Sequence, residues 1–215
     1  MAPPLQSASG PRLLLATSSQ KKLVELRSIF ASLPLSLLTL RDAGVDMEVE
    51  ETGETFRDNA VLKAEQYARA SGLPALADDS GLEVDALGGE PGVRSARYAG
   101  PEATDADRIA LVLGKLDARP DAPRTARFRC VMALADPERL IDTVEGACEG
   151  IIAAAPRGTN GFGYDPIFLL PDLGRTMAEL TAAEKDELSH RGRAGRAARP
   201  LLERWLLATA RPPRP

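Results

Sequence analysis

The stretch RLLLATSSQKKLVELRSIF, residues 12–30, joins a short apolar run to a helical repeat. The run at 12–17 is typical of a buried strand, and Leu23, Leu26 and Phe30 recur at the spacing of one helix face. A polar turn lies between the two patterns. A strand, a turn and a helix in this order begin an α/β unit, so this stretch predicts a β-sheet covered by helices.

Four further segments predict strands. LSLLTL at 35–40 and PIFLL at 166–170 are short apolar runs. RTARFRCVMALAD at 124–136 and RLIDTVEGACEGIIAAA at 139–155 alternate over enough residues to predict two long strands, paired antiparallel. PALADDSGLEVDAL at 74–87 predicts a strand, a polar turn and another short strand. The fold class that follows is α/β with a mixed sheet.

Three further segments predict helices. TGETFRDNAVLKAEQYARASG at 52–72 ends on a glycine, which is common just past a helix C-terminus. A second helix is predicted at 104–117, with aspartates in its first turn, where negative charge favours the helix dipole. A third helical region runs from Ala178 past Trp205, and Pro200 should begin a new segment there or kink the helix.

The chain has 215 residues, of which 44% are hydrophobic, enough for one substantial core. We expect a single domain over 11–210, with a disordered lead over 1–10 and a proline-rich tail over 211–215. No run of about 18 apolar residues is present that would span a membrane. The first ten residues lack the basic start and apolar centre of a secretory signal. A cytoplasmic protein without a membrane partner is therefore expected.

The net charge is −4, and the chain has one histidine and two cysteines. The acidic balance argues against nucleic acid as a partner, because nucleic-acid binders carry a basic surface. Cys130 and Cys148 form no Cys-x-x-Cys zinc motif, so we expect both to be reduced core residues. The lone His190 excludes zinc sites that need several histidines. The arginines after Arg191, up to Arg199, are expected on a solvated helix face.

The polar turn at 17–22 is a candidate phosphate site. It places hydroxyls and free N–H groups at a strand-to-helix junction, with Lys21 and Lys22 in the first turn of the helix. Lysines there oppose the helix dipole, a placement that an anion between them would explain. The alternative is an ordinary capped turn with exposed lysines, since no glycine-rich phosphate loop is present. The candidate residues are Thr17, Ser18, Ser19, Gln20, Lys21 and Lys22.

The helix at 55–70 carries a lysine on its apolar face. That face runs through Ala60 and Ala64, and at about 100° per residue Lys63 falls inside it, with Asn59 one turn earlier. An unpaired buried ammonium is costly, so this lysine requires a charged partner. Alternatively, its stem packs on the helix while its amine reaches the surface.

Asp78 and Asp79, followed by Ser80 and Gly81, supply adjacent carboxylates at the end of an apolar strand, where they would line a cleft at the strand's tip. Mg²⁺ prefers oxygen ligands and keeps several waters, so one or two carboxylates with substrate phosphates suffice to hold it. A solvated turn is the alternative. A second acidic cluster before the lysine-bearing helix consists of Glu48, Glu50, Glu51 and Glu54.

GTNGFGYDP at 158–166 is a glycine-rich loop that carries Phe162 and Tyr164. Aromatic side chains on such a loop suit stacking against a nucleobase, or else they cover the core at a glycine-assisted turn. His190 next to Arg191 can donate to carbonyl oxygens, although a cap at a helix end explains this pair equally well.

Together these motifs resemble those of the inosine/xanthosine triphosphate pyrophosphatase family, the Ham1-like hydrolases of non-standard purine triphosphates. The resemblance runs from about Leu13 to Leu207. It is carried by Ala16-Thr17 with Lys22, EETGETFRDNAVLKA, ALADDSGLEVDALGGEPGVRSARYAG, GFGYDPIF and AELTAAEKDELSHRGRA. It implies a homodimer of elongated α/β subunits, each with an active-site cleft between two lobes. It also implies Mg²⁺-dependent cleavage between the α- and β-phosphates by a carboxylate-activated water, giving a nucleoside monophosphate and pyrophosphate.

The resemblance also implies a role for each candidate residue. Asp79 would be the general base and a metal-linked carboxylate, with Glu51 as a second metal ligand. Residues 17–22 and Ser80 would hold the triphosphate, together with Lys63, which would also contribute to catalysis. The residues that would hold the base are Phe162, Gly163, Tyr164, Asp165, Lys185, His190 and Arg191.

The phosphate turn departs from the family pattern. The family usually reads Thr-Gly-Asn-x-Gly-Lys there, whereas this chain has Ser18 and Lys21 in place of the glycines and Ser19 in place of the asparagine. A serine reaches less far than an amide, and the lost glycines restrict the backbone. Efficiency is therefore expected to differ from that of relatives.

Three other functions fit parts of the sequence. A related nucleotide pyrophosphatase would act on pyrimidine or modified nucleotides. The altered phosphate turn would suit a weakly catalytic nucleotide-binding protein or sensor. An RNA-binding module would use 191–199 with the aromatic loop, but the acidic net charge disfavours it. Release of pyrophosphate from inosine triphosphate in the presence of Mg²⁺ separates the enzyme from the sensor.

Overall fold

The computed structural model describes residues 10–209. Its helices, 3-10 helices (η) and strands are, in order, β1 (Arg12–Leu15), α1 (Gln20–Ile29), β2 (Ser36–Thr39), α2 (Phe56–Ser71), β3 (Ala75–Val84), η1 (Asp85–Leu87), η2 (Gly92–Arg97), α3 (Asp105–Asp117), β4 (Thr125–Ala135), β5 (Leu140–Ile152), η3 (Asp165–Ile167), β6 (Phe168–Leu170), β7 (Arg175–Thr176), η4 (Met177–Glu179), α4 (Ala182–Leu188) and α5 (His190–Thr209). The lead expected at 1–10, except for Gly10, and the tail expected at 211–215 lie outside the described residues. Between 10 and 209, no helix has both the length and the apolar character to cross a membrane.

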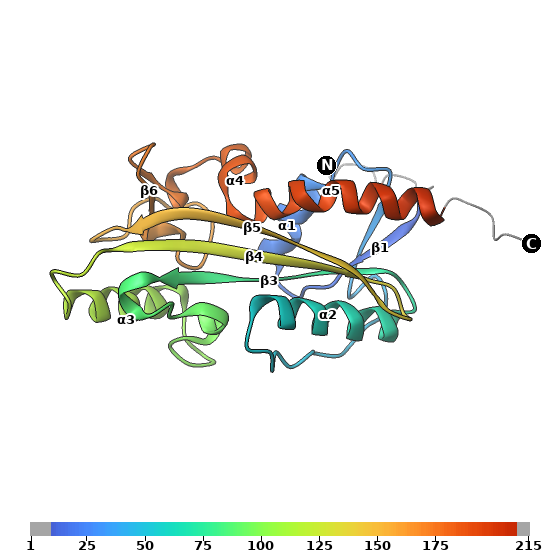
Figure 1. Ribbon diagram of the computed structural model, residues 1–215, viewed down its shortest axis with the longest axis horizontal. Helices are drawn as coiled ribbons and strands as arrows, with labels where there is room; N and C mark the ends of the chain where they lie inside the picture. Colours follow the sequence, from blue (N-terminus) through green and yellow to red (C-terminus); the bar gives the residue numbers. More distant parts are fainter. Residues whose placement is uncertain (1–9, 210–215) are drawn as a thin grey trace, which may run out of the picture.

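The strands form one seven-stranded mixed sheet in the order β2-β1-β3-β4-β5-β6-β7. β1 is parallel to β2 and to β3, and each later pair of neighbours is antiparallel. The α/β class and the long antiparallel pair are therefore confirmed. β3, β4 and β5 run along the long axis of the molecule (Figure 1). Cys130 of β4 and Cys148 of β5 are free and buried, as predicted.

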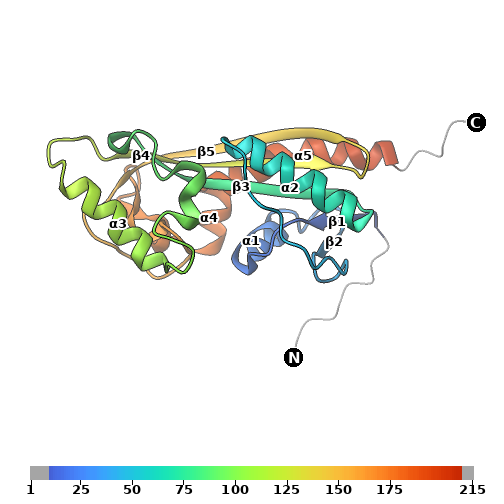
Figure 2. The ribbon, with the colours of Figure 1, turned by 90° about the horizontal axis from the view of Figure 1, so that it is seen from below.

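Helices cover different parts of this sheet. α2 packs through Ala60 and Ala64 on the face of β4 that carries Val131 and Ala133, while α1 and α5 pack on the opposite face. Further along the long strands, α3 shares a separate cluster with β6 around Phe168. Figure 2 shows α3 at one end of the strands and α1, α2, β1 and β2 toward the other.

Local capping explains where the first two helices begin. Ser19 caps α1, since its Oγ accepts the N–H of Lys22 at 3.4 Å, and Thr17 Oγ1 accepts the N–H of Ser19 at 3.2 Å. α2 follows Thr55, which forms a capping box with Asp58. The predicted strand, polar turn and helix are confirmed, and the turn is held by its own side chains.

The predicted turn within 74–87 is wrong. β3 runs unbroken over Ala75–Val84 and pairs with β4 along its whole length. Its two aspartates therefore lie inside the strand rather than at its tip, because each finds cationic partners on its own face of the sheet. Gly81 stays in the strand because η2 crosses directly over it: a Cβ there would lie 2.6 Å from the carbonyl oxygen of Gly92.

The C-terminal helical region divides at Ser189 rather than at Pro200. Ser189 is extended, with φ −71° and ψ 161°, and its Oγ accepts the N–H of Gly192 at the start of α5. α5 continues through Pro200, which is exposed, so water can hydrate the carbonyl left without its N–H partner. Arg193 and Arg196 are exposed on α5, which confirms the solvated face for these two. Arg199 is instead half-buried, because it donates to the Ile29 carbonyl oxygen and to the Ser32 hydroxyl.

Candidate active site

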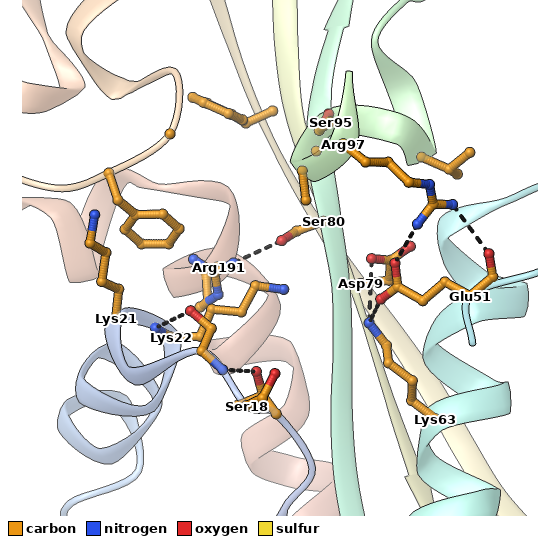
Figure 3. A pocket seen from close by; sticks show the side chains of 18 of the residues that line it. Ser18, Lys21, Lys22, Glu51, Lys63, Asp79, Ser80, Ser95, Arg97 and Arg191 are labelled. Carbon is orange, nitrogen blue, oxygen red and sulfur yellow. Dashed lines mark hydrogen bonds and ion pairs between the residues drawn. The ribbon is translucent and has the colours of Figure 1, made fainter. Parts of the chain in front are cut away.

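A pocket of about 830 Å³ lies at the open edge of β3. β1 ends at Leu15 and pairs with β3 only at Ala75 and Leu76, so within the described chain β3 continues beyond β1 without a strand on that side. The volume suits a small-molecule ligand. Sequence-predicted residues that line the pocket are Thr17, Ser18, Ser19, Lys21, Lys22, Glu51, Lys63, Asp79, Ser80, Phe162, Gly163, Tyr164, Asp165, Lys185, His190 and Arg191 (Figure 3). Gln20 is exposed and lines a neighbouring hollow instead.

Asp79 and Glu51 meet at the amine of Lys63 (Figure 3). Lys63 Nζ lies 3.5 Å from Asp79 Oδ1 and pairs with Glu51 Oε1, and Asn59 Nδ2 donates to Asp79 Oδ2 at 3.2 Å. Lys63 is only 9% exposed, which confirms a buried lysine paired with acids. Burial raises the pKa of Asp79 in spite of the opposing charge of Lys63. A carboxylate with a raised pKa accepts a proton more readily near neutral pH.

Glu51 is also contacted from η2. Arg97 donates to Glu51 Oε2 and to the Glu51 carbonyl oxygen, both at 3.2 Å (Figure 3). Burial tends to raise the pKa of Glu51, but the charge of Lys63 and of its other cationic neighbours lowers it overall. Sequence reasoning missed Arg97, because a single arginine in SARYAG carries no chemical signal until the fold brings η2 against the 48–51 segment.

Asp78 faces the other side of β3, because successive side chains of a strand alternate. Its Oδ2 lies 3.0 Å from Lys22 Nζ and 3.2 Å from Arg191 Nη2, and Ser80 Oγ donates to it at 3.3 Å. Although burial tends to raise the pKa of Asp78, these cations hold it well below its ordinary value. Asp78 is 2% exposed and is not among the residues that line the pocket.

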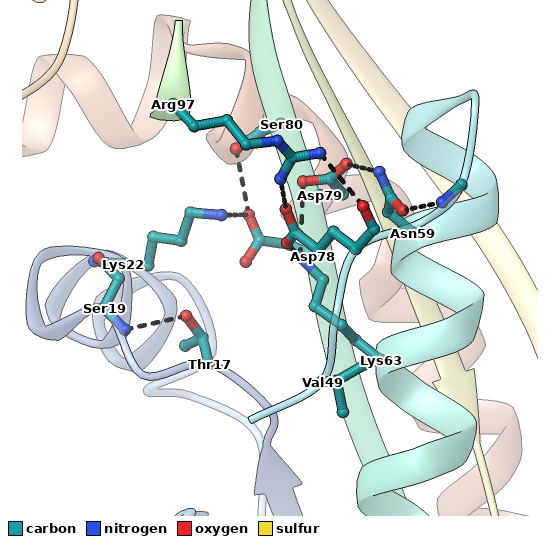
Figure 4. Close-up of polar contacts among 12 residues, drawn as sticks. Thr17, Ser19, Lys22, Val49, Asn59, Lys63, Asp78, Asp79, Ser80 and Arg97 are labelled. Carbon is teal, nitrogen blue, oxygen red and sulfur yellow. Dashed lines mark hydrogen bonds and ion pairs between the residues drawn. The ribbon is translucent and has the colours of Figure 1, made fainter. Parts of the chain in front are cut away.

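The two lysines of the phosphate turn point to different partners. Lys22 turns inward to Asp78 (Figure 4). Lys21 lies with its Nζ 3.5 Å from Asp105 Oδ2 of α3 and 5.6 Å from the centre of the Phe162 ring. Asp105 Oδ2 also accepts the N–H of Gly163 at 2.9 Å. The turn at 17–22 therefore contacts β3 on one side. On the other side it contacts α3 and the glycine-rich loop at 158–166 that carries Phe162.

At the other end of the pocket, α1 supplies an acid that joins two cations. Glu25 Oε1 lies 2.8 Å from Lys185 Nζ, and Glu25 Oε2 lies 2.6 Å from Arg191 Nη1. Lys185 also pairs with Asp165, and its Nζ lies 4.7 Å from the centre of the Phe162 ring. Burial raises the pKa of Asp165. Sequence reasoning missed Glu25, whose only signal was its place one helix turn after the phosphate turn.

His190 and Tyr164 are set into the core beside this end of the pocket. The His190 ring stacks on Phe128, with centroids 4.6 Å apart and planes at 17°, and burial lowers its pKa, which keeps it neutral. Its Nδ1 is buried without a hydrogen-bond partner among residues 10–209. The Tyr164 hydroxyl donates to the Ser95 carbonyl at 2.9 Å. Of the two loop aromatics, Phe162 is half-buried and Tyr164 is buried.

The acidic end provides oxygen ligands suited to a small hard cation. Between residues 10 and 209, no group of three or more histidine, cysteine, aspartate or glutamate side chains is arranged to hold a metal ion. Glu51 and Asp79 both line the pocket and share the amine of Lys63. Two carboxylates fit Mg²⁺, which takes its remaining ligands from water and phosphate.

Comparisons with known proteins give consistent matches. The model of the Ham1 family matches residues 13–201. A dITP/XTP pyrophosphatase of Geobacillus kaustophilus is 51% identical over 182 residues, covering 85% of this chain and 89% of that protein. A dITP/XTP pyrophosphatase of Thermus thermophilus is 51% identical over 188 residues, covering 87% of this chain and 90% of that protein. The structure of a HAM1 protein from Coxiella burnetii has a TM-score of 0.84 at 45% identity and covers 90% of this chain and 99% of that chain.

Proposed function

This chain belongs to the Ham1 family, and from that premise we propose that it is a dITP/XTP pyrophosphatase. Inosine, deoxyinosine and xanthosine triphosphates are its substrates, and a nucleoside monophosphate and pyrophosphate are its products. The observation that carries the proposal is the division of one pocket into two ends. Glu51, Lys63 and Asp79 lie at one end, and Lys185 and Arg191 at the other.

We assign Mg²⁺ to the carboxylates of Glu51 and Asp79. Both are oxygen donors in the same pocket, and two protein ligands suit an ion that completes its shell with water and substrate phosphates. When bound, Mg²⁺ would neutralise charge on the phosphates and polarise the phosphorus that is attacked.

Asp79 accepts the proton of the attacking water. The raised pKa of Asp79, caused by burial, supports this role, and Asn59 and Lys63 fix the orientation of its carboxylate. The water oxygen bonds to the α-phosphorus while the bond from that phosphorus to the bridging oxygen breaks. Pyrophosphate leaves with the electron pair of the broken bond.

The triphosphate is bound by the cationic and hydroxyl groups around the open edge of β3. Lys22 and Lys63 approach this edge from its two sides, and Ser80 lies between them on β3. Positive groups there stabilise the charge that develops on the departing pyrophosphate. The turn residues Thr17, Ser18, Ser19 and Lys21 complete this subsite. Gln20 does not belong to the triphosphate subsite, because it does not line the pocket.

The base is selected at the end built from Phe162, Gly163, Tyr164, Asp165, Lys185, His190 and Arg191. Hypoxanthine and xanthine present a carbonyl oxygen at position 6, where adenine presents an amino group. The side chains of Arg191 and Lys185 can only donate hydrogen bonds. They pair with the carbonyl oxygen, but the amino group of adenine is itself a donor and cannot accept from them. A buried group left unpaired in this way rejects the wrong base strongly.

We further propose two lobes, a homodimer and a cytoplasmic location. The separate apolar cluster around α3 and β6, apart from the clusters under α1, α2 and α5, supports lobes on the two sides of the pocket. The homodimer rests on the family resemblance, and light scattering after size-exclusion chromatography tests it. Free buried cysteines agree with a reducing compartment.

A nucleotide panel tests the function. Purified protein is incubated with Mg²⁺ and one of the triphosphates of inosine, deoxyinosine, xanthosine, guanosine, adenosine or cytidine, and pyrophosphate and monophosphate are measured. We expect equal amounts of both products from the first three at rates well above the rest, and none in preparations of Asp79→Asn. Release of orthophosphate, or preference for a standard nucleotide, would contradict the proposal.

A further inference from the structure

Asp78 is a buried carboxylate that the mechanism above does not use. It is 2% exposed, and it does not line the pocket. Its Oδ1 is buried and has no hydrogen-bond partner among the described residues. A metal ligand needs an oxygen that reaches the pocket, and so does a base that takes a proton from water. Asp79 has such an oxygen and Asp78 does not, so neither role fits Asp78.

All charged contacts of Asp78 within the described chain converge on its other oxygen. Lys22 of α1 lies 3.0 Å from Oδ2, and Arg191 of α5 approaches the same oxygen with Nη2 at 3.2 Å and Nε at 3.4 Å. Figure 4 shows Lys22 reaching Asp78 from the phosphate turn. A single oxygen atom is therefore the shared partner of two cations from different helices.

These two cations serve different parts of the pocket. Lys22 belongs to the turn at 17–22, at the triphosphate end. Arg191 reaches the other end, where its guanidinium carbon lies 5.6 Å from the centre of the Phe162 ring. We propose that Asp78 is a positioning residue that couples selection of the base to binding of the triphosphate, an inference that rests on the function proposed above.

The coupling follows from competition for one acceptor. When a triphosphate attracts Lys22, Arg191 becomes the main partner of Asp78 Oδ2 and is held more firmly in the orientation that meets the base. In the low-dielectric interior such a redistribution is felt strongly, because water does not replace the lost partner. Coupling of this kind is reciprocal, so the correct base also favours release of Lys22 to the phosphates.

The neighbouring contacts permit a direct test by Asp78→Asn. Arg191 keeps Glu25 at 2.6 Å and Ser80 Oγ at 2.8 Å, so its guanidinium is not left unpaired when Asp78 loses its charge. The amide preserves the shape of the side chain. We therefore expect the variant to fold, while both cations lose their shared anchor.

The decisive quantity is the ratio of kcat/KM for inosine triphosphate to kcat/KM for adenosine triphosphate. Asp78→Asn should lower this ratio at least about 10-fold, because coupling between two sites typically changes affinity by about 5- to 150-fold. The Mg²⁺ concentration for half-maximal rate should stay within about twofold of the wild-type value. Without Mg²⁺, calorimetry should show the preference for inosine monophosphate over adenosine monophosphate reduced as well. Asp172→Asn, which removes an exposed carboxylate outside the pocket, serves as the matched control and should change neither quantity.

Two results would overturn the inference. A raised Mg²⁺ requirement with an intact ratio would make Asp78 a metal ligand, and an equal loss on both substrates would make it purely structural. If Asp78→Asn is unfolded by circular dichroism, Lys22→Gln replaces it. With the competing cation removed, Arg191 stays the main partner of Asp78 whether or not phosphates are bound. The binding preference for inosine over adenosine should then be the same for the monophosphates and the triphosphates, whereas in the wild type it should be larger for the triphosphates; a variant that keeps the wild-type difference refutes the coupling. Absence of pyrophosphate release by the wild-type protein would contradict the proposed function instead, and the monophosphate preferences would still test Asp78.

Discussion

Neighbouring carboxyl groups on β3 have opposite pKa shifts because the strand turns them to opposite faces. Burial raises the pKa of Asp79 against the nearby charge of Lys63, and the repulsion of Glu51 adds to the rise. Asp78 is more buried, yet two close cations hold its pKa well below the ordinary range. A general base must take up a proton near neutral pH. Of the two, Asp79 alone has a raised pKa, which favours this role, and Asp79 alone lines the pocket.

Asp79→Asn should abolish turnover while leaving the fold intact. The amide still accepts a hydrogen bond but cannot take the proton of water, and the loss of a general base typically lowers kcat by about 10²–10⁴-fold. The measurement is the rate of pyrophosphate release from inosine triphosphate at saturating Mg²⁺, with a thermal melt of the same sample. Asp58→Asn makes the same chemical change at an exposed capping residue. It is the control for the effect of replacing an aspartate by an asparagine away from the reacting water. Near-normal activity of Asp79→Asn would contradict the assignment.

Ser19 offers a test in the direction of improved activity. The Ser19 side chain caps α1, and asparagine is an equally good N-cap, so Ser19→Asn should leave the melting temperature nearly unchanged. The longer amide can also donate to a phosphate. KM for inosine triphosphate should therefore fall, or kcat should rise, by a few-fold. Unaltered kinetics in this variant, together with unaltered kinetics in Lys22→Ala, would place the turn away from the substrate.

At the scale of elements, the contact of η2 with β3 sets one wall of the pocket. The Ser95 hydroxyl accepts the N–H of Leu82 at 2.9 Å and donates to the Gly92 carbonyl oxygen at 2.6 Å. Arg97, at the end of the same 3-10 helix, contacts Glu51. The bare backbone at Gly81 allows this approach, so the position of Arg97 depends on a residue with no side chain.

Gly81→Ala should therefore disturb both stability and activity. Its Cβ would lie 2.6 Å from the Gly92 carbonyl oxygen and 2.9 Å from Phe56 Cε1, and such overpacking costs about 1–3 kcal/mol. The melting temperature should fall by roughly 2–4 °C per kcal/mol, and kcat should fall as η2 moves from Glu51. Gly114→Ala, on the exposed face of α3 with no atom near the new Cβ, should instead stabilise the protein by about 1 kcal/mol. A melting temperature unchanged by Gly81→Ala would refute the close approach.

The sequence predicts most elements well because their signals are local. Helical spacing locates α1. The capping box of Thr104 begins α3 at the place that the aspartates of its first turn predicted. The unbroken β3 could not be predicted, because two adjacent acids in an apolar strand normally indicate a turn. The cations that make the strand possible, Lys22 and Arg191, lie far away along the chain. A local pattern cannot contain such partners.

The same limit applies to the site. Lys63 could be recognised because its position on an apolar helix face requires a charged partner. Glu25 and Arg97 could not, since each is an ordinary charged residue until the fold brings it to Lys185 or to Glu51. Lys185 was predicted as a site residue from the family motifs alone, because the spacing of residues around it gives no sign of a functional role. Sequence thus predicted the chemical types at the pocket better than the pairs they form.

For the molecule as a whole, Glu25 links helices that lie far apart in the sequence. From α1 it reaches Lys185 of α4 at 2.8 Å and Arg191 of α5 at 2.6 Å. Asp186 of α4 also accepts a hydrogen bond from Ser28 of α1 at 2.6 Å. These contacts attach the C-terminal helices to the first α/β unit, so the end of the pocket proposed to hold the base and the stability of the fold depend on the same ion pairs.

Glu25→Gln should therefore destabilise the protein in a manner that depends on pH. Burial tends to raise the pKa of Glu25, but the charges of Arg191 and Lys185 outweigh it and lower the pKa overall. A carboxyl whose pKa is lower in the folded than in the unfolded state stabilises the fold above its unfolded pKa of about 4.3. That contribution disappears as the pH falls through the folded pKa. Removing one partner of a buried pair costs about 3 kcal/mol, or roughly 6–12 °C in Tm.

We expect the Tm of Glu25→Gln to lie below that of the wild type by a constant amount between about pH 6 and 8, well above the unfolded pKa of the carboxyl. The difference should shrink as the pH falls below about 4, because the unfolded wild-type chain then takes up a proton at Glu25. It should vanish as the pH falls through the lower pKa of the folded carboxyl, where the wild type loses the charge that the variant lacks. Thermal melts across this range measure it, and Glu138→Gln, at an exposed position outside the pocket, is the control that should show no such trend. A difference that persists undiminished to about pH 2 would mean that Glu25 stabilises the fold through shape alone. Equal melting temperatures near pH 7 would mean that the ion pairs only orient Lys185 and Arg191 for the base.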